Sequence, residues 1–352
     1  MSVSARVTAG PGNGPTHGGG RTIGPMPRSD DLRLRAGEIS LAATLTVPGG
    51  QATERLPWAL LVPSWLPRGR DGGWDRVSHP TWFAPHDRTD APGLFERLAV
   101  ALAARGVASL RYDPRGCGES GGDWAASSLF DRIDDARDVI GAMRSRPGLD
   151  LRRTAIVGHG EGAVIAISVA IGDPAIGAVG LIGPPARNFR DVLRRGVAER
   201  DRSGTDREHP IVAALDAAAE ELIERAARRE PEMDLRVADA SVRLSLAGCE
   251  QAIHTPALAL ATMLHRHIVI AHGDRDAWAD PDESRLLAAV MAEAGNEPVL
   301  QLVEGASHDL GEADDDRIGA FADALVDAME PRELPPVLVA IEEMTGEIRE
   351  RR

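Results

Sequence analysis

The sequence predicts an α/β fold, namely a doubly wound and mostly parallel sheet with an inserted helical cap. Short apolar runs typical of buried strands alternate with helical patterns through most of the chain, as in sheets that carry helices on both faces. Between residues 184 and 265 the alternation stops, and helical patterns with charged faces replace it without a strong strand pattern. A chain of 352 residues suits one large domain with such an insertion.

The expected elements can be placed in order along the chain. Alternating apolar positions predict an antiparallel hairpin over residues 33–47. Later strands are predicted by short apolar runs at 58–62, 107–112, 153–158, 176–182 and 299–303. Helices are predicted at 94–105, 129–143, 163–170, 188–201, 209–229 and 283–294. Gly106 and the Pro147-Gly148 pair mark the ends of the first two helices.

These elements divide the chain into four parts. Residues 1–30 are rich in Gly, Pro, Ser and Thr and are expected to form a disordered tail. Residues 31–183 together with 266–330 form the predicted core, and residues 184–265 form the predicted cap. Residues 331–352 are a C-terminal extension that follows the last core helix.

Composition excludes several classes of function. A net charge of −14 argues against nucleic acid or an anionic membrane as a partner. The two cysteines, Cys117 and Cys249, lie far apart, which indicates no disulfide framework and fits a reducing cytoplasm. No apolar run has the length of a membrane span, and the N-terminus lacks the apolar region of a signal peptide. We therefore expect a cytoplasmic protein that takes a small-molecule substrate or ligand.

Two charged or amphipathic segments have an ordinary structural interpretation. The arginines between Arg187 and Arg207 are interleaved with acids, which is typical of a solvated helix face rather than an anion site. Residues 337–350 can form an amphipathic helix in the C-terminal extension. We expect that helix to dock on its own domain, and a homodimer contact is the alternative.

The most informative segment is a strand, a glycine-rich turn and a helix at residues 154–163. The turn reads Gly158-His159-Gly160-Glu161-Gly162 and has the frame of a nucleophile elbow, G-x-S-x-G. In that frame the central residue takes a positive φ so that its side chain projects above the sheet, and the flanking glycines allow strand and helix to approach closely. Here the central residue is Gly160, which has no oxygen to acylate.

Three further segments accompany this frame in a fixed order. They are LRYDPRGCGESGG at 110–122, IVIAHGDRD at 268–276 and LVEGASHDL at 302–310. Together with the elbow they resemble the α/β-hydrolase superfamily, in particular its bacterial esterase and serine aminopeptidase-like members. The resemblance covers most of residues 31–330 apart from the insertion, and the order elbow, acid, histidine is the one this fold uses.

The resemblance implies a role for each matching residue. Asp276 is the expected triad acid and should hydrogen-bond His308, the expected triad histidine. The amide of Glu161, which follows the nucleophile position, is the expected first donor of the oxyanion hole. Trp65, in the Val62-Pro63-Ser64-Trp65 stretch, is the nearest match for the second donor, although the usual His-Gly start is missing.

Four other side chains could replace the missing serine. Ser64, Cys117, Ser120 and Ser307 lie on loops that resemble those at the carboxyl edge of the sheet. Cys117 is chemically the best nucleophile of the four, yet a small buried thiol is its more common role. His159 and Glu161 flank Gly160, and we expect their side chains to diverge from the site.

Three functions remain open on the sequence alone. In the first, His308 oriented by Asp276 acts as a general base on water or on the substrate, an ester, thioester or amide-type small molecule of the kind met in secondary metabolism. In the second, the protein is a non-catalytic pseudo-hydrolase that binds a ligand or a partner protein. In the third, a serine esterase or peptidase has been inactivated by a Ser-to-Gly change. No organic cofactor is implied, and no cluster of residues has the sequence spacing of metal ligands.

Overall fold

The computed structural model describes residues 6–7, 26–50, 54–83, 92–205, 209–331, 333, 338–341 and 343. The strands are β1 (Arg6–Val7), β2 (Arg28–Ala36), β3 (Ile39–Val47), β4 (Leu56–Val62), β5 (Ala108–Tyr112), β6 (Leu149–His159), β7 (Ile176–Ile182), β8 (Glu232–Val237), β9 (Ala240–Ser245), β10 (His267–Gly273) and β11 (Val299–Val303). The helices are α1 (Leu94–Ala103), α2 (Leu129–Arg144), α3 (Glu161–Gly172), α4 (Phe189–Ser203), α5 (Pro210–Ala227), α6 (Ala247–His254), α7 (Ala257–Ala261), α8 (Pro281–Glu293) and α9 (Asp315–Ala328).

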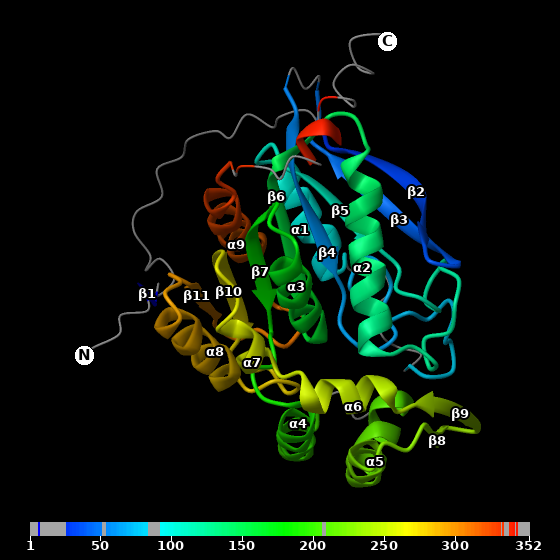
Figure 1. Ribbon diagram of the computed structural model, residues 1–352. Coiled ribbons are helices and arrows are strands. Elements are labelled where there is room, and N and C mark those ends of the chain that lie inside the picture. Colours follow the sequence, from blue (N-terminus) through cyan, green and yellow to red (C-terminus); the bar gives the residue numbers. More distant parts are fainter. Residues whose placement is uncertain are drawn as a thin grey trace.

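A twisted central sheet organises the molecule (Figure 1). Its strand order is β1-β11-β10-β7-β6-β4-β5-β3-β2. The strands from β1 to β5 in that order run parallel, whereas β3 pairs antiparallel with both β5 and β2. The doubly wound, mostly parallel sheet predicted from the sequence is thereby confirmed.

Helices cover both faces of this sheet. One core cluster joins the sheet to α2, α3, α7 and α8, and a second joins its other face to α1 and α9. Alternate residues of β6 supply the two clusters, since Ile156 belongs to the first and Val157 to the second. Burial of strands on both faces explains why their sequences read as continuous apolar runs.

The cap lies beyond one end of the sheet and consists of α4, α5, the β8–β9 hairpin and α6 (Figure 1). The hairpin corrects the expectation that residues 184–265 hold no strand. Met233, Leu235 and Val237 point into the cap core while the residues between them are exposed, so half of this hairpin is polar. Helix α7, although inside the predicted cap, packs its Ala257 and Ala261 into the main core.

Parts of both ends of the chain are ordered and contact the core. Residues Arg6–Val7 pair with β11, and β2 begins at Arg28, so the expected disorder of residues 1–30 is wrong for these parts. Most of that tail lies outside the described residues. Leu338 is buried against Leu151 and Ala175, which supports docking of the C-terminal extension on its own domain. The remainder of the predicted helix at 337–350 lies largely outside the described residues.

No helix within the described ranges combines the length and the apolar character that crossing a bilayer requires.

Candidate active site

The turn between β6 and α3 places Gly160 between a strand and a helix with a positive φ. Gly160 takes φ 54° and ψ −123°, a conformation that L side chains adopt only under strain. The strand on one side and the helix on the other confirm the predicted strand–turn–helix arrangement. The bare Cα of Gly160 therefore marks the place where the family pattern puts its nucleophile.

Gly158 and Gly162 are required because backbone atoms of neighbouring segments approach them closely. A Cβ on Gly158 would lie 2.0 Å from the carbonyl oxygen of Gly162, and a Cβ on Gly162 would lie 2.4 Å from the carbonyl oxygen of Val62. Neither position has room for a larger residue without moving backbone. The turn is consequently pressed against the end of β4 and the loop that follows it.

His308 and Asp276 meet at the carboxyl end of the sheet, on the loops after β11 and β10. His308 Nδ1 and Asp276 Oδ2 are 2.7 Å apart, which confirms the predicted hydrogen bond. A Cβ on Gly160 would lie 2.9 Å from His308 Nε2, so this second ring nitrogen faces the elbow. The dyad thus presents a nitrogen to the position where a nucleophile or water would sit.

Asp276 is held from several sides. Its Oδ1 accepts hydrogen bonds from the amides of Trp278 and Ala279 at 2.7 and 2.8 Å. The Nε2 atom of His272 lies 3.0 Å from Oδ2, on the carboxylate oxygen that also binds His308. Burial raises the pKa of Asp276, but His308 and His272 outweigh burial and lower that pKa below its ordinary range. Asp276 is therefore a fixed negative charge.

His272 and Ser284 support the dyad and were not singled out from the sequence. The Nε2 atom of His272 lies 2.8 Å from the carbonyl oxygen of Ala279 and therefore carries the proton, while Nδ1 lies 2.5 Å from the hydroxyl of Ser284. His272 therefore helps to orient the Asp276 carboxylate. In the sequence, the one feature that could have pointed to His272 is its position directly before Gly273, at the start of the turn that carries Asp276.

The two histidines near the elbow have opposite electrostatic environments. Burial lowers the pKa of His308, but the charge and hydrogen bond of Asp276 raise it above its ordinary value. Burial and the neighbouring His308 lower the pKa of His159 to about 3, so His159 is neutral. Its ring lies 4.5 Å from that of His308, and its Nε2 lies 3.1 Å from the carbonyl oxygen of His308. His159 therefore packs against His308 and is not among the described residues that line the cavity next to the elbow.

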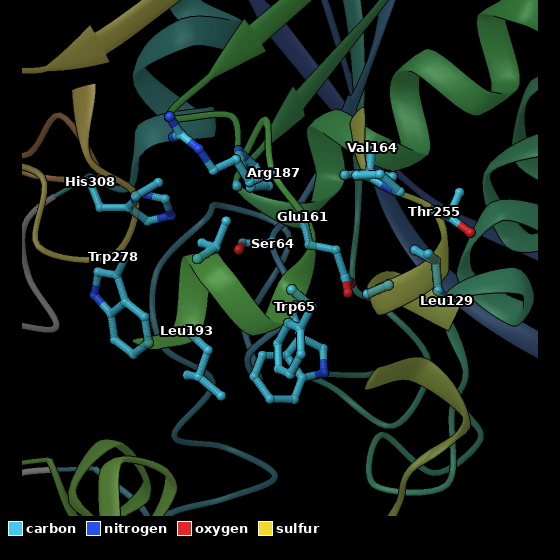
Figure 2. Close-up of a pocket in the computed structure, with 18 of the residues that line it drawn as sticks. Ser64, Trp65, Leu129, Glu161, Val164, Arg187, Leu193, Thr255, Trp278 and His308 are labelled. Atoms are coloured by element: carbon cyan, nitrogen blue, oxygen red, sulfur yellow. The ribbon is translucent and has the colours of Figure 1, made fainter. Parts of the chain in front are cut away.

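A cavity of about 110 Å³ opens above Gly160 (Figure 2). It lies between the sheet end and the cap. Its apolar lining includes Trp65, Leu129, Val164, Phe189, Leu193 and Trp278, and its polar lining includes Ser64, Glu161 and His308. The cavity suits a largely apolar group placed next to one basic nitrogen.

Glu161 lines this cavity, which corrects the expectation that its side chain diverges from the site. Its carboxylate pairs with Arg132 at 2.8 Å, and both side chains are largely buried. Burial raises the pKa of Glu161 in spite of that pairing. As the first residue of α3, Glu161 has a backbone N–H without an acceptor inside its own helix, as an oxyanion donor requires. Trp65 lines the cavity, and its amide stays a predicted second donor.

Three of the four alternative nucleophiles are unsuited to this cavity. Burial and then Asp75 raise the pKa of Cys117 far above its ordinary range. The hydroxyl of Ser120 donates to the carbonyl of Asp113 at 2.7 Å and accepts from the amide of Ala42 at 2.9 Å. The hydroxyl of Ser307 donates to Glu312 at 2.8 Å. Only Ser64 among the four lines the cavity.

One cap arginine contradicts the expected solvated face. Arg200 is 1% exposed, and its Nη2 lies 2.6 Å from Asp216 on α5. Its Nη1 donates to the carbonyl of Ala277 at 3.0 Å, and its guanidinium lies 4.0 Å from the centre of the Trp278 ring. Helix α4 turns this residue toward the interior of the cap, whereas Arg202 on the same helix is exposed. Arg200 therefore ties the cap to the loop that carries the acid.

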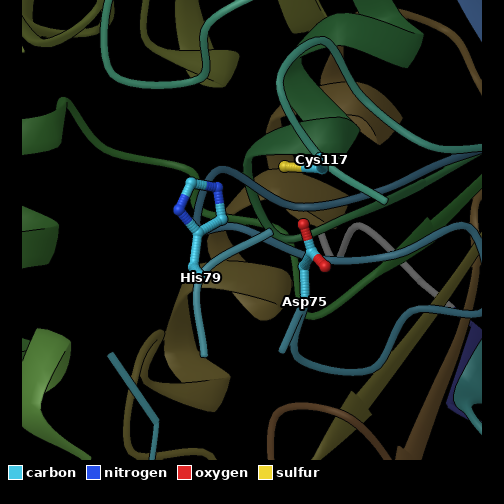
Figure 3. A group of neighbouring side chains, drawn as sticks. All are labelled: Asp75, His79 and Cys117. Atoms are coloured by element: carbon cyan, nitrogen blue, oxygen red, sulfur yellow. The ribbon is translucent and has the colours of Figure 1, made fainter. Parts of the chain in front are cut away.

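Two groups of side chains within the described residues have the spatial spacing of metal ligands, although their sequence spacing predicts none. One is His159, His308 and Asp309, and the other is Asp75, His79 and Cys117 (Figure 3); in each group the donor atoms lie within 4.8 Å of one another. The first group contains the dyad histidine His308 and two residues that lie beside it.

The second group already has a structural role. Asp75 accepts hydrogen bonds from the amides of Val77, Ser78 and Gly118. The Nε2 atom of His79 lies 3.2 Å from the carbonyl oxygen of Gly116 and donates to it. The group therefore joins the loop after β4 to the loop after β5.

The sheet order, the elbow and the acid–histidine pair together define an α/β-hydrolase fold. Solved structures agree: Est1E from Butyrivibrio proteoclasticus, with ferulic acid bound, matches with a TM-score of 0.55 at 15% identity over 90% of this chain and 98% of its own. The α/β hydrolase GrgF from Penicillium sp. sh18 matches with a TM-score of 0.56 at 16% identity over 86% and 99%. An acylaminoacyl peptidase from Pyrococcus horikoshii matches with a TM-score of 0.59 at 13% identity over 90% of this chain and 44% of its own.

The family follows from the sequence. Residues 82–314 match the family described as serine aminopeptidase, S33, and the chain belongs to it. The esterase- and peptidase-like resemblance is thereby confirmed at the level of family and fold. No curated protein matches the sequence significantly.

Proposed function

We propose that the protein hydrolyses an ester, thioester or amide bond of a small, largely apolar molecule, with His308 as general base and Asp276 as its orienting acid. The observation that carries this proposal is the 2.7 Å contact between His308 Nδ1 and Asp276 Oδ2, with Nε2 turned to the space above Gly160. The fixed charge of Asp276 keeps the proton of neutral His308 on Nδ1, so Nε2 is free to accept one. A carbonyl carbon bound above Gly160 would then lie next to the basic nitrogen.

The cavity supports an uncharged substrate. Its two arginines are already neutralised, because Arg187 pairs with Glu283 and Arg200 pairs with Asp216. Most of the other lining residues are apolar, among them tryptophan, phenylalanine, leucine and valine side chains. Apolar acyl or aryl groups therefore fit this lining better than carboxylates or phosphates.

The test is hydrolysis of a series of p-nitrophenyl esters with acyl chains of increasing length, followed by thioester and anilide analogues. The variant His308→Ala should lose about 10²- to 10⁴-fold in kcat/KM, the usual contribution of a positioned base. The matched control is His267→Ala, since that side chain is 55% exposed at the start of β10. Equal activity of both variants would overturn the assignment of His308.

A non-catalytic binding protein is the second candidate, and the missing side chain at Gly160 favours it. The same assay separates the two functions. A wild-type protein that turns over no ester, thioester or anilide, yet gains several degrees of Tm with an apolar carboxylic ester, would be a binder.

A further inference from the structure

The position that a Cβ on residue 160 would take, at the floor of the cavity, is occupied by a side chain from a different loop. A Cβ on Gly160 would lie 2.3 Å from Ser64 Oγ and 3.1 Å from Ser64 Cβ. The same point lies 2.9 Å from His308 Nε2. The hydroxyl of Ser64 therefore occupies the volume in which an elbow side chain would begin, next to the basic nitrogen of the dyad (Figure 2).

We propose that Ser64, on the loop after β4, is the nucleophile of this site and forms an acyl-enzyme in place of residue 160. This inference rests on the proposed hydrolase function and adds to it the atom that attacks the substrate. It makes the triad Ser64, His308 and Asp276, with its members in the chain order serine, acid, histidine.

The position of Ser64 is determined by backbone packing. The carbonyl oxygens of Val62 and Pro63 lie 2.4 and 2.6 Å from the point where a Cβ on Gly162 would sit. The loop is also held by the segment between β5 and α2, because the carbonyl of Trp65 accepts a hydrogen bond from Trp124 Nε1 at 2.7 Å. Contacts on both sides of Ser64 thus hold its backbone against the elbow.

The hydroxyl of Ser64 is available for chemistry. Across the described residues it makes no hydrogen bond, in contrast to the hydroxyls of Ser120 and Ser307. It lines the cavity together with His308. Hydrogen bonds between a nucleophile and its base are often long until substrate closes the site, so a rotation of the Ser64 side chain toward Nε2 on binding is within the usual range.

The reaction balances without a co-reactant other than water. Ser64 Oγ attacks the carbonyl carbon while its proton passes to His308 Nε2, and the resulting oxyanion is stabilised by the amide of Glu161. Collapse breaks the bond to the leaving group, which takes the proton from Nε2. Water then gives its proton to Nε2 and attacks the acyl carbon, after which Ser64 Oγ departs with that proton.

A fluorophosphonate probe tests this proposal directly, because a serine oxygen displaces its fluoride and leaves a stable adduct. Trypsin releases residues 56–68 as a peptide whose sole hydroxyl- or thiol-bearing side chain is Ser64, so one fragment mass locates the adduct. We expect wild type to label on that peptide and Ser64→Ala to lose the label and about 10³-fold or more of ester hydrolysis. Ser307→Ala is the matched control and should keep both.

The outcomes separate the two proposals. Ester hydrolysis that depends on His308 but persists in Ser64→Ala, without a label on residues 56–68, would overturn the nucleophile and leave the base in place. A label that survives in Ser64→Ala would also overturn it. A folded wild type that neither labels nor hydrolyses any ester would overturn both.

Discussion

The two halves of the candidate site differ in how strongly the surrounding structure holds them. The acid–base half is over-determined, since both oxygens of Asp276 are engaged by amides or histidine rings and His272 is itself anchored by Ser284. In the nucleophile half, Gly160 is bare and the Ser64 hydroxyl has no hydrogen bond within the described part of the chain. The dyad is thus held by contacts that do not involve residue 160, and a hydroxyl from another loop lies where an elbow side chain would begin.

The largest expected effect on kcat/KM comes from a change in the acid–base half, at Asp276. Asp276→Asn replaces an acceptor by an amide whose N–H₂ faces His308 Nδ1, which favours the wrong tautomer of the ring. We expect a loss of about 10⁴-fold in kcat/KM for ester hydrolysis, as when a triad acid becomes an amide in other enzymes. The matched control is Asp274→Asn, on the same loop as Asp276, where the remaining side-chain oxygen can still accept the Gly305 N–H, so kcat/KM should stay nearly unchanged.

The same variant should change the pH profile in a defined direction. Neutral His308 is the active base, and Asp276 raises the pKa of His308, so the wild-type rate should rise with pH through a pKa above the ordinary histidine value. Removing the carboxylate charge lowers that pKa, so the rising limb should move to lower pH in Asp276→Asn. An unmoved limb would show that Asp276 does not control the protonation of His308.

The next largest effect tests how far the acid–base half extends into the cap. Arg200→Met leaves Asp216, itself only 7% exposed, as an unpaired buried carboxylate. Breaking such a pair costs about 3–5 kcal/mol of unfolding free energy, measurable by urea denaturation. Arg202→Met on the same helix should change stability by about 0.5 kcal/mol or less, because that side chain is 76% exposed. Equal losses of unfolding free energy in the two variants would contradict the burial of Arg200 and support the solvated helix face predicted from the sequence.

Much of the fold could be predicted because its central strands are buried on both faces. Strands 176–182 and 299–303 were predicted to the residue, since each is a short, mostly apolar run next to residues that end a strand, Gly183-Pro184 after the first and Pro298 before the second. The β8–β9 hairpin was missed because its strands are half polar and its turn places Ala238, not glycine, at φ 51°. The burial of Arg200 was missed because charge alternation along a helix does not reveal which turn faces the interior.

The site could be predicted only in part for a related reason. The order of the four motifs brought Asp276, His308 and the elbow together, because each follows a strand of the same parallel sheet. The placement of the Ser64 hydroxyl over Gly160 depends on how closely the end of β4 packs on α3. That distance is a property of tertiary packing, so the sequence did not show which of the four candidate side chains reaches the elbow.

The smallest expected change in stability comes from moving the hydroxyl to residue 160, and it tests the nucleophile half most specifically. Gly160→Ser alone adds a Cβ 2.3 Å from Ser64 Oγ at a residue with φ 54°, which costs about 1–3 kcal/mol of backbone strain in addition to moving Ser64. Combining it with Ser64→Gly removes the steric conflict and leaves one hydroxyl at the elbow. We expect the double variant to carry the fluorophosphonate label at position 160, and the single variant to be less stable in urea than the double variant. Adding His308→Ala to the double variant should abolish the label. A double variant that folds but stays unlabelled would mean that the oxyanion donors do not serve a hydroxyl at position 160. In that case the dyad could act only on a hydroxyl at position 64.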